Sequence, residues 1–357
     1  MVPGQLFLEP EDIAVHSALS RGAALLGACS DLPHAPQAAP VALYLAALSG
    51  EALVLGRHQL SSQVLAGRSG VPVCRRATGG TAVRAGSGVL YAALALADRS
   101  SLMSCPPGRL LNRNVRGMLT GLRLAGAKAN YFGRDFLSFG AQPAVYAGWD
   151  ALEHPSAGTG TVLLEFFFSH TRSCFVSDAE LSYPARQEPA LRGQAPTTLQ
   201  EAGVDMPLPQ LFEQLAQGHA KSYGVDWQTG NAASITPHPN EPPSADDVAD
   251  ARRLSWSTPR EEAIGFVSAG LALDGAGKVA AIRVAGDFFA HRGCMATLER
   301  VLLGVSPTTE HVGHAVDAAF AHAGYDSEGI RSLRTFQDAI IDAAAAAASV
   351  LSDPTER

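Results

Sequence analysis

Short runs of consecutive apolar residues alternate along the chain with longer stretches in which apolar residues recur at helical spacing. The short runs, which are typical of strands, lie at 41–48, 52–55, 71–74, 89–97 and 161–169. Helical spacing predicts helices at 11–28, 110–124 and 208–223. The run at 161–169 lacks regular polar alternation, which predicts a strand that is buried on both faces.

The hydrophobic pattern changes after Leu181, where prolines begin to interrupt it. Four prolines lie between Thr236 and Ser244, a composition that is typical of a linker. Beyond Glu261, a hairpin is predicted around the turn Asp274–Gly277, and helices are predicted at 295–303, 310–323 and 330–351. We therefore predict a first domain at 1–225, a Pro-rich linker at 226–260 and a small α+β domain at 261–357.

The composition is that of a soluble globular protein, because 46% of the 357 residues are hydrophobic and only 17% are charged. The N-terminus lacks the basic and apolar regions of a signal peptide, and no apolar run approaches the ~20 residues of a membrane helix. Five cysteines without a C-x-x-C pair argue against a disulfide framework and a structural zinc site. We predict a cytoplasmic protein that binds no membrane and has no metal site of its own.

Basic residues concentrate in the middle of a chain whose formal net charge is −7. Between Arg57 and Arg134 the only acidic residue is Asp98, whereas arginines are frequent. This distribution disfavours nucleic-acid binding and suits an anionic small ligand or an acidic protein partner.

The predicted helix at 110–124 carries apolar residues on one face and arginines on the neighbouring face. The apolar set consists of Leu111, Val115, Met118, Leu119 and Leu122. The basic set, which we call the arginine face, consists of Arg109, Arg113, Arg116 and Arg123. It forms either a solvated surface or a docking surface for an acidic partner, and the sequence leaves both interpretations open.

The stretch Arg75–Val83 combines two arginines with a Gly-rich turn between strand-like runs. Guanidinium groups match carboxylate and phosphate oxygens, and glycine amides approach an anion closely because glycine lacks a Cβ atom. Side chains alternate along a strand, so Arg75 and Arg76 cannot both face the same ligand. The stretch predicts an anion-facing loop; the alternative is a tight turn with two solvated arginines.

Four motifs, taken in order, resemble those of the lipoate–protein ligase A family, which shares its catalytic fold with biotin ligases and octanoyltransferases. Gly56–Gln59 matches Gly-Arg-x-Gln, and Arg75–Val83 matches Arg-Arg-x-(Ser/Thr)-Gly-Gly followed by Ala-Val. Gly133–Phe136 is similar to a Gly-Arg-Asp strand. Gly286–Phe289 has the Gly-Asp-Phe-Phe signature of the family's C-terminal accessory domain. The resemblance extends over most of the chain.

The resemblance implies an α/β fold, with a mixed β-sheet flanked by helices and a small α+β C-terminal domain. It also implies an activity in which ATP and Mg²⁺ activate a lipoate-like carboxylic acid as an acyl-adenylate. The acyl group then passes to a lysine of an acidic lipoyl or acyl-carrier domain. The residues that it places at the substrate or nucleotide are Arg75, Arg76, Thr78, Gly79, Gly80, Thr81 and Asp135. Of the two arginines, Arg75 is expected to face the pocket.

The chain departs from the family pattern where the catalytic lysine is expected. Family members carry Gly-x-Lys-Ile-x-Gly after the Gly-Arg-Asp strand, whereas Gly140–Gly148 contains no lysine. The His, Asp and Asn that follow the Gly-Gly loop in the family are also absent from Arg84–Val89. We therefore predict a degenerate relative and assign no catalytic residue.

The sequence leaves three functions open. The first is an ATP-dependent ligase for lipoate or another acyl acid. The second is a catalytically inactive homologue that binds a carboxylate or nucleotide ligand, or an acidic carrier domain. The third is a thiol-dependent acyltransferase that uses Cys174, which follows His170 by four residues. Such a thiol needs a neighbouring group that lowers its pKa.

Overall fold

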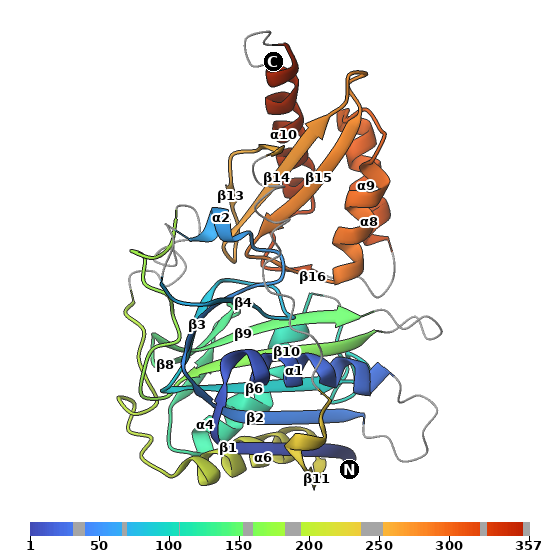
Figure 1. Cartoon of the computed structure of the whole chain (residues 1–357). Coiled ribbons are helices and arrows are strands. Elements are labelled where there is room, and N and C mark those ends of the chain that lie inside the picture. Colours follow the sequence, from blue (N-terminus) through green and yellow to red (C-terminus); the bar gives the residue numbers. More distant parts are fainter. Residues whose placement is uncertain are drawn as a thin grey trace.

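The computed structural model describes residues 1–30, 40–65, 70–106, 108–152, 160–182, 194–236, 253–321 and 327–352. Its largest feature is an eight-stranded sheet with the order β11-β1-β2-β6-β10-β9-β8-β7 (Figure 1). The strands are β1 (Val2–Ala14), β2 (Val41–Ser49), β6 (Val89–Leu96), β7 (Ala129–Tyr131), β8 (Phe136–Phe139), β9 (Gln142–Leu152), β10 (Thr161–Ser169) and β11 (Val225–Gly230). β1 runs parallel to β2 and β11, and the other neighbours are antiparallel. The predicted mixed sheet is confirmed.

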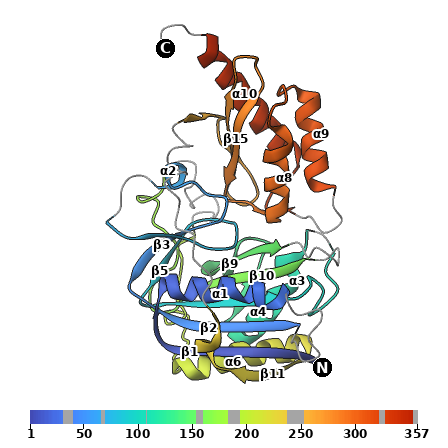
Figure 2. The ribbon, with the colours of Figure 1, turned by 45° about the vertical axis from the view of Figure 1, so that its right-hand side comes forward.

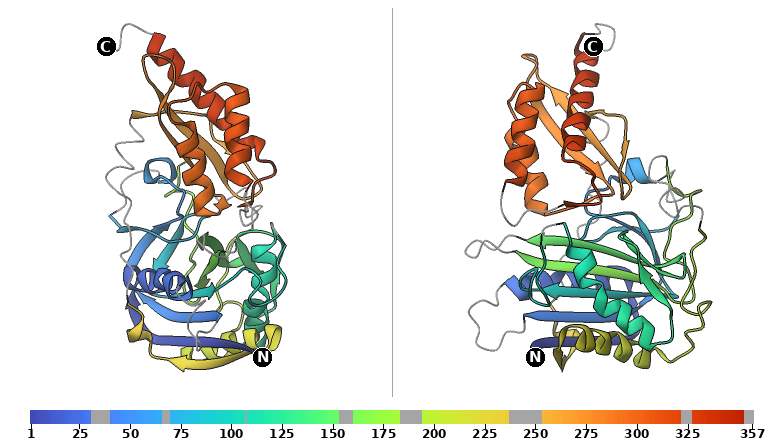
Figure 3. Two further views of the ribbon diagram at one scale, coloured as in Figure 1. Left: turned by 90° about the vertical axis from the view of Figure 1, so that its right-hand side faces the viewer. Right: turned by 180° about the vertical axis from the view of Figure 1, so that it is seen from behind.

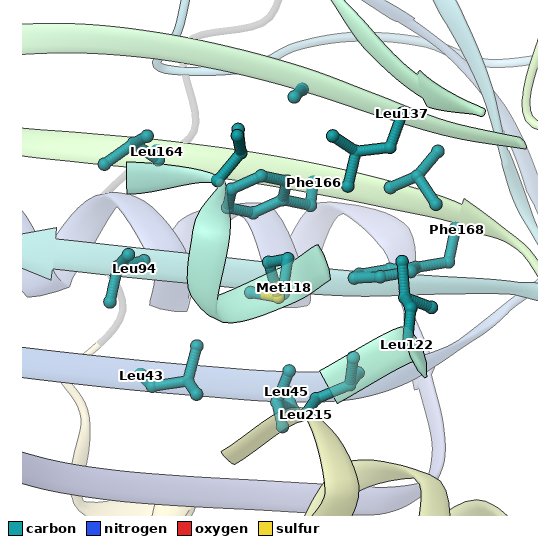
Figure 4. Close-up of a cluster of buried hydrophobic side chains, with 14 of the residues drawn as sticks. Leu43, Leu45, Leu94, Met118, Leu122, Leu137, Leu164, Phe166, Phe168 and Leu215 are labelled. Carbon is teal, nitrogen blue, oxygen red and sulfur yellow. The ribbon is translucent and has the colours of Figure 1, made fainter. Parts of the chain in front are cut away.

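Helices cover both faces of this sheet. α1 (Val15–Ser30) packs on one face, whereas α3 (Leu110–Asn114), α4 (Arg116–Leu124) and α6 (Leu208–Tyr223) lie on the other, which is seen from behind in Figure 3. The central strand β10 supplies both layers, because Phe166 and Phe168 point to the α4 side and Phe167 points to the α1 side. Figure 4 shows the α4 side, where Met118 and Leu122 meet the phenylalanines. Burial on both faces explains the unbroken apolar run.

A three-stranded sheet holds the Gly-rich stretch. Its order is β4-β3-β5, with β3 (Glu51–Leu55) parallel to β4 (Val73–Arg75) and antiparallel to β5 (Val83–Gly86). The loop Arg76–Ala82 connects its two outer strands, and the short α2 (Ser61–Val64) follows β3. The strands on either side of the loop, β4 and β5, therefore both pair with β3, which holds the two ends of the loop in place.

The C-terminal unit has its own sheet and helical layer, and it stands above the large sheet in Figures 1 and 2. β14 (Phe266–Leu273) and β15 (Val279–Gly286) form the predicted hairpin. Shorter strands are β12 (Ser255–Trp256), β13 (Arg260–Glu261), β16 (Phe289–Ala290) and β17 (Ser327–Glu328). The helices α8 (Arg292–Leu302), α9 (Thr309–Phe320) and α10 (Arg334–Ser352) bury a shared core against the hairpin.

The N-terminal residues differ from the prediction. β1 extends to Ala14, so the helix that we predicted from residue 11 begins only at Val15. Strand pairing overrides the local helical spacing, because Ile13 and Ala14 pair with Leu48 and Ser49 of β2.

The predicted linker contains regular structure at its start. Residues 226–230 belong to β11, which pairs with β1, and Ala232–Ser234 form a 3₁₀ turn. The proline cluster of the linker lies outside the described residues, apart from Thr236. The two predicted boundaries, after residues 225 and 260, therefore stay a prediction. Within the described residues, no helix combines the length and apolarity that crossing a membrane requires.

Candidate functional site

Arg76 lies underneath the Gly-rich loop and holds its shape. Its guanidinium group donates to the carbonyl oxygens of Gly79 and Thr81, both at 2.7 Å, and to the hydroxyl of Tyr146 at 2.5 Å. It also donates to Thr78 Oγ1 and to the carbonyl of Val54, each at 3.2 Å, and it stacks on the Tyr146 ring. Only 2% of Arg76 is exposed. Arg76 therefore braces the loop from the inside.

Arg75 points elsewhere. Its guanidinium donates to the carbonyl oxygens of Gly56, Arg57 and Gln59, at 3.0, 3.0 and 2.6 Å. The two arginines thus take opposite sides of β4, as strand alternation requires. Arg76 occupies the interior of the loop, and the expectation that Arg75 faces a ligand pocket stays a prediction.

Gly79 and Gly80 lie directly against the C-terminal unit. The amide of Gly80 donates to the carbonyl of Phe288 at 3.2 Å, and the amide of Gly79 donates to the carbonyl of Trp149 at 3.3 Å. Gly80 has φ +90°, and a Cβ atom there would lie 2.5 Å from the Phe289 ring. A Cβ atom on Gly79 would lie 2.5 Å from the carbonyl oxygen of Phe288. The space that a ligand could occupy next to these two glycines is therefore filled by the Phe288 carbonyl and the Phe289 ring.

Two buried carboxyl groups complete the surroundings of the loop. Glu165 accepts hydrogen bonds from the amide of Thr78 at 2.9 Å and from the hydroxyl of Tyr91 at 2.6 Å. Asp135 accepts one from Thr81 Oγ1 at 3.0 Å. Burial raises the pKa of both carboxyl groups, and the positive charge of Arg76 opposes this rise in each. The loop is therefore satisfied by internal acids, an internal arginine and internal carbonyl groups.

The first and fourth motifs meet across the boundary between the two units. Gln59 donates to Asp287 Oδ1 at 2.5 Å and accepts from the amide of Gly56 at 2.7 Å. The His58 ring stacks on the Phe288 ring with 4.7 Å between the centroids, and the His58 carbonyl accepts from the amide of Gly286. Motifs that are more than two hundred residues apart thus form one contact.

Two further contacts hold the C-terminal unit to the large sheet. Arg292 donates to Asp150 Oδ2 through Nε at 2.8 Å and through a terminal nitrogen at 2.5 Å. Glu328 accepts from the indole of Trp149 at 2.9 Å and from the amide of Leu111 at 3.2 Å. Asp150 is 1% exposed, so its pairing with Arg292 stabilises a charge that would otherwise be costly to bury.

The two units also share hydrophobic cores. Ile264 and Phe289 of the C-terminal unit belong to the core cluster around β10 and α4. Phe266 belongs to a cluster with Leu53 and Leu55 of β3. Separation of the units would expose these side chains, at a cost of about 1.5–3 kcal/mol for each large side chain that leaves its core.

Asp287 gives this boundary a pH dependence. Burial raises the pKa of Asp287 to about 7, and the hydrogen bond from Gln59 only partly opposes the rise. A raised carboxyl pKa means that the stabilising contribution of Asp287 is complete below its unfolded pKa and is lost as the pH rises through about 7. The protonated form is the one that suits the buried position.

We expect Asp287→Asn to remove this titration. The free energy of unfolding of the variant, relative to that of the unchanged protein, should then rise by about 2–3 kcal/mol between pH ~5 and pH ~7. Urea unfolding at a series of pH values measures the difference. Asp317→Asn, at an exposed aspartate of α9, is the matched control. Parallel pH profiles for Asp287→Asn and the unchanged protein would contradict the assignment.

The structure brings most of the predicted site residues together. Arg76, Thr78, Gly79, Gly80, Thr81 and Asp135 belong to one hydrogen-bonded group, and Arg75 adjoins it through Gly56. Sequence reasoning missed Tyr146 and Glu165 as members of this group, and it missed the contacts of Asp150 and Gln59 with the C-terminal unit. A lone acid within the apolar run of β10 was the signal that could have found Glu165, whereas Asp150 had none. The roles of all these residues in binding stay predictions.

The residues, as they are arranged, do not fit an ATP–Mg²⁺ complex. The amides of Thr78, Gly79 and Gly80 already donate to protein oxygens, and both arginines donate to backbone carbonyls. The chain has three lysines, Lys128, Lys221 and Lys278, and β8 and β9 contain none of them. Among the described residues, no three His, Cys, Asp or Glu side chains are placed to hold a metal ion. We therefore derive no step through ATP or a metal.

Cys174 lies in the interior with the wrong electrostatics for a nucleophile. Its thiol donates to the carbonyl of Phe167 at 3.2 Å, and the residue is fully buried. Burial raises the pKa of the Cys174 thiol to about 11. A nucleophilic cysteine needs a lowered pKa and access for a substrate, and Cys174 has neither.

Comparison with known proteins identifies the fold. No family model matches the chain, and no curated protein matches it. Among solved structures, P. falciparum LipL1 in complex with lipoate has a TM-score of 0.67 at 12% identity, over 98% of this chain and 100% of that chain. The chain has the fold of a lipoate–protein ligase. This confirms the resemblance at the level of the fold.

Two other solved ligases match about two thirds of the chain. A bi-partite lipoate protein ligase from Thermoplasma acidophilum has a TM-score of 0.49 at 14% identity, over 66% of this chain and 91% of that chain. A lipoate-protein ligase A bound with ATP has a TM-score of 0.47 at 14% identity, over 65% of this chain and 92% of that chain.

Proposed function

We propose that this protein is a non-catalytic member of the lipoate-ligase fold and works by binding a partner. The observation that carries the proposal is the internal engagement of the loop Arg76–Ala82. Every amide from Thr78 to Gly80 donates to a protein oxygen, and the Arg76 guanidinium donates to five. A loop that activates a carboxylic acid must instead present such donors to the reacting oxygens.

The composition of the β8–β9 hairpin supports the same proposal. A reaction between a carboxylate and an α-phosphate brings negative charges together, so a catalyst needs cations that face both groups. Arg75 and Arg76 hold the backbone, and Gln142 and Pro143 occupy the start of β9, where the resemblance leads one to expect a lysine. The positive charges of Arg75 and Arg76, which an adenylation reaction would need at its reacting groups, are bound instead to backbone carbonyls.

The position of the C-terminal unit against the loop also supports the proposal. Phe289 packs against Trp149, with 6.2 Å between the ring centroids, and lies over Gly80. An acyl chain that entered beside Gly80 would have to displace this ring together with the Phe288 carbonyl. Displacement of the C-terminal unit would also separate Arg292 from the buried Asp150, which would keep, among the described residues, only the more distant Arg57, at 3.8 Å, as an ion-pair partner.

Release of pyrophosphate from ATP tests the proposal directly. We expect no release that depends on an added acid when the full chain is supplied with Mg²⁺ and lipoate, octanoate or biotin. Calorimetric titration with ATP and with lipoate should likewise give no heat of binding. Acid-dependent release with any of the three acids would overturn the proposal.

The second candidate is an ATP-dependent acyl-acid ligase in which the C-terminal unit moves off the loop. The similarity in fold over nearly the whole of both chains favours it. It requires that a weaker contact between the units increases the rate, so Arg292→Met should raise acid-dependent pyrophosphate release. Under the first proposal this variant stays as inactive as the unchanged protein.

A further inference from the structure

The arginine face lies on the solvent side of α3 and α4. The opposite face is buried in the main core, with Leu111, Val115, Met118 and Leu122 at most 1% exposed. Arg109, Arg116 and Arg123 are exposed, and Arg113 is half-buried. Val115 joins the two helices with near-helical angles and donates to the Leu111 carbonyl, so the side chains keep their helical spacing.

Several arginines elsewhere in the structure pair with carboxylates. Such pairs join Arg21 to Glu9, Arg84 to Glu51 and Glu180, Arg260 to Asp342, and Arg292 to Asp150. Within the described part of the chain, Arg109, Arg113 and Arg116 have no carboxylate partner. These three arginines follow one another along one helix face, in a protein that has more acids than bases.

Arg113 and Arg123 differ in their surroundings. The Nε atom of Arg113 is buried and has no hydrogen-bond partner among the described residues. Arg123, by contrast, donates twice to the carbonyl of Ala129, at 3.0 and 2.7 Å, and closes the end of its own helix. The cations that remain for a partner are therefore Arg109, Arg113 and Arg116.

The end of α6 adds a fourth positive charge. Ser222 donates to the carbonyl of Arg116 at 3.4 Å, and Tyr223 donates to the carbonyl of Arg113 at 2.7 Å. Lys221, next to them in the chain, is exposed. Like charges on neighbouring helical positions repel each other by about 0.2–0.5 kcal/mol per pair, a cost that an acidic partner removes.

We propose that Arg109, Arg113, Arg116 and Lys221 form a docking surface for a small protein domain with a carboxylate-rich surface. Guanidinium groups bind carboxylates through two parallel hydrogen bonds, and a row at helical spacing can engage several of them. The proposal rests on the proposed function, since a protein that works by binding needs such a surface. An acidic lipoyl or acyl-carrier domain belongs to this chemical class.

A nucleic acid is a poorer match for this surface. The sequence pI is about 5.9 and the net charge is −7, so a polyanion that extends beyond the arginine face meets repulsion. Domains that bind nucleic acid carry a basic surface over a larger area, with a pI above about 9. A compact acidic domain contacts the arginine face alone.

The experiment compares charge reversal on the arginine face with a matched reversal elsewhere. The test variant is Arg109→Glu with Arg116→Glu, two exposed residues whose side chains make no ion pair among the described residues. The control is Arg300→Glu with Arg331→Glu, two exposed arginines of the C-terminal unit. The probes are an acidic lipoyl domain, an acidic acyl-carrier domain and poly-L-glutamate, each titrated against the full chain by fluorescence anisotropy.

We expect the unchanged protein and the control to bind the acidic probes with equal affinity, and the test variant to bind at least about tenfold more weakly. Binding should weaken when the salt concentration rises from about 0.05 to about 0.2 M. The proposal is overturned if no acidic probe binds, if both double variants lose affinity equally, or if a single-stranded oligonucleotide or phosphatidylserine vesicles bind more tightly. Pyrophosphate release, measured separately, decides the proposed function independently of this result.

Discussion

Replacement of Arg76 by methionine should destabilise the protein more than any of the other substitutions that we propose. The variant keeps much of the side-chain volume but removes the Arg76 donor from the carbonyls of Thr81 and Val54, and leaves the Gly79 carbonyl with the Tyr146 hydroxyl. It also removes the positive charge that faces Glu165 and Asp135. Removal of one member of such a buried network costs about 3–5 kcal/mol, so we expect a loss of about 4 kcal/mol in the free energy of unfolding.

Urea and thermal unfolding, followed by circular dichroism, measure this loss. Arg260→Met is the matched control, because its pairs with Asp338 and Asp342 are exposed and such pairs contribute less than about 1 kcal/mol. Arg76→Lys keeps the charge but cannot reach all the acceptors, so its loss should be intermediate. Equal losses for Arg76→Met and Arg260→Met would mean that Arg76 does not brace the loop.

Gly80→Ala should have the second-largest effect, through both conformation and contact. Alanine at φ +90° is strained by about 1–2 kcal/mol, and its Cβ atom would overlap the Tyr146 hydroxyl and lie 2.5 Å from the Phe289 ring. Overpacking of this kind costs about 1–3 kcal/mol more. We therefore expect a total loss of about 3 kcal/mol in the free energy of unfolding, together with a loosened contact between the loop and the C-terminal unit.

Gly140→Ala separates the two causes, because Gly140 has φ +60° and a Cβ atom there would meet no other atom within 4 Å. This control should lose only about 1 kcal/mol. Hydrogen exchange adds a local measurement, since the amide of Gly80 donates to Phe288 only while the units are in contact. Faster exchange at the amides next to residue 80 is expected in Gly80→Ala and not in Gly140→Ala. Equal losses of stability in the two variants would argue against close packing of the Phe289 ring on Gly80.

The predictions for Arg76→Met and Gly80→Ala test the same feature. A loop whose sequence resembles an anion-binding loop instead holds the C-terminal unit against the large sheet. The loop binds Phe288 and Phe289 of the C-terminal unit on its outer side and Arg76 and Glu165 on its inner side. This arrangement leaves the arginine face of α3 and α4 as the surface on which we place partner binding.

Elements with a strong local pattern were predictable from the sequence. The apolar run at 161–169 became β10, the spacing at 208–223 became α6, and the Asp274–Gly277 turn joined β14 to β15. The central helix was correct in its buried face but is divided at Val115. The strand β1 was not predicted, because its pairing with β2 and β11, and not a local pattern, defines it.

The sequence by itself determined the strands and helices with a strong hydrophobic pattern and the four motifs, and through the motifs the fold, because both are read from residues close together in the chain. Only the tertiary structure decided what the motifs contact. Gln59 meets Asp287, Arg292 meets Asp150, and Arg76 instead of Arg75 enters the loop. These contacts join residues far apart in the chain, and their free energy depends on burial and on which donors find acceptors. No local sequence pattern specifies these pairings. Only the tertiary structure therefore shows that the loop's hydrogen-bonding groups are bound by other groups of the same protein.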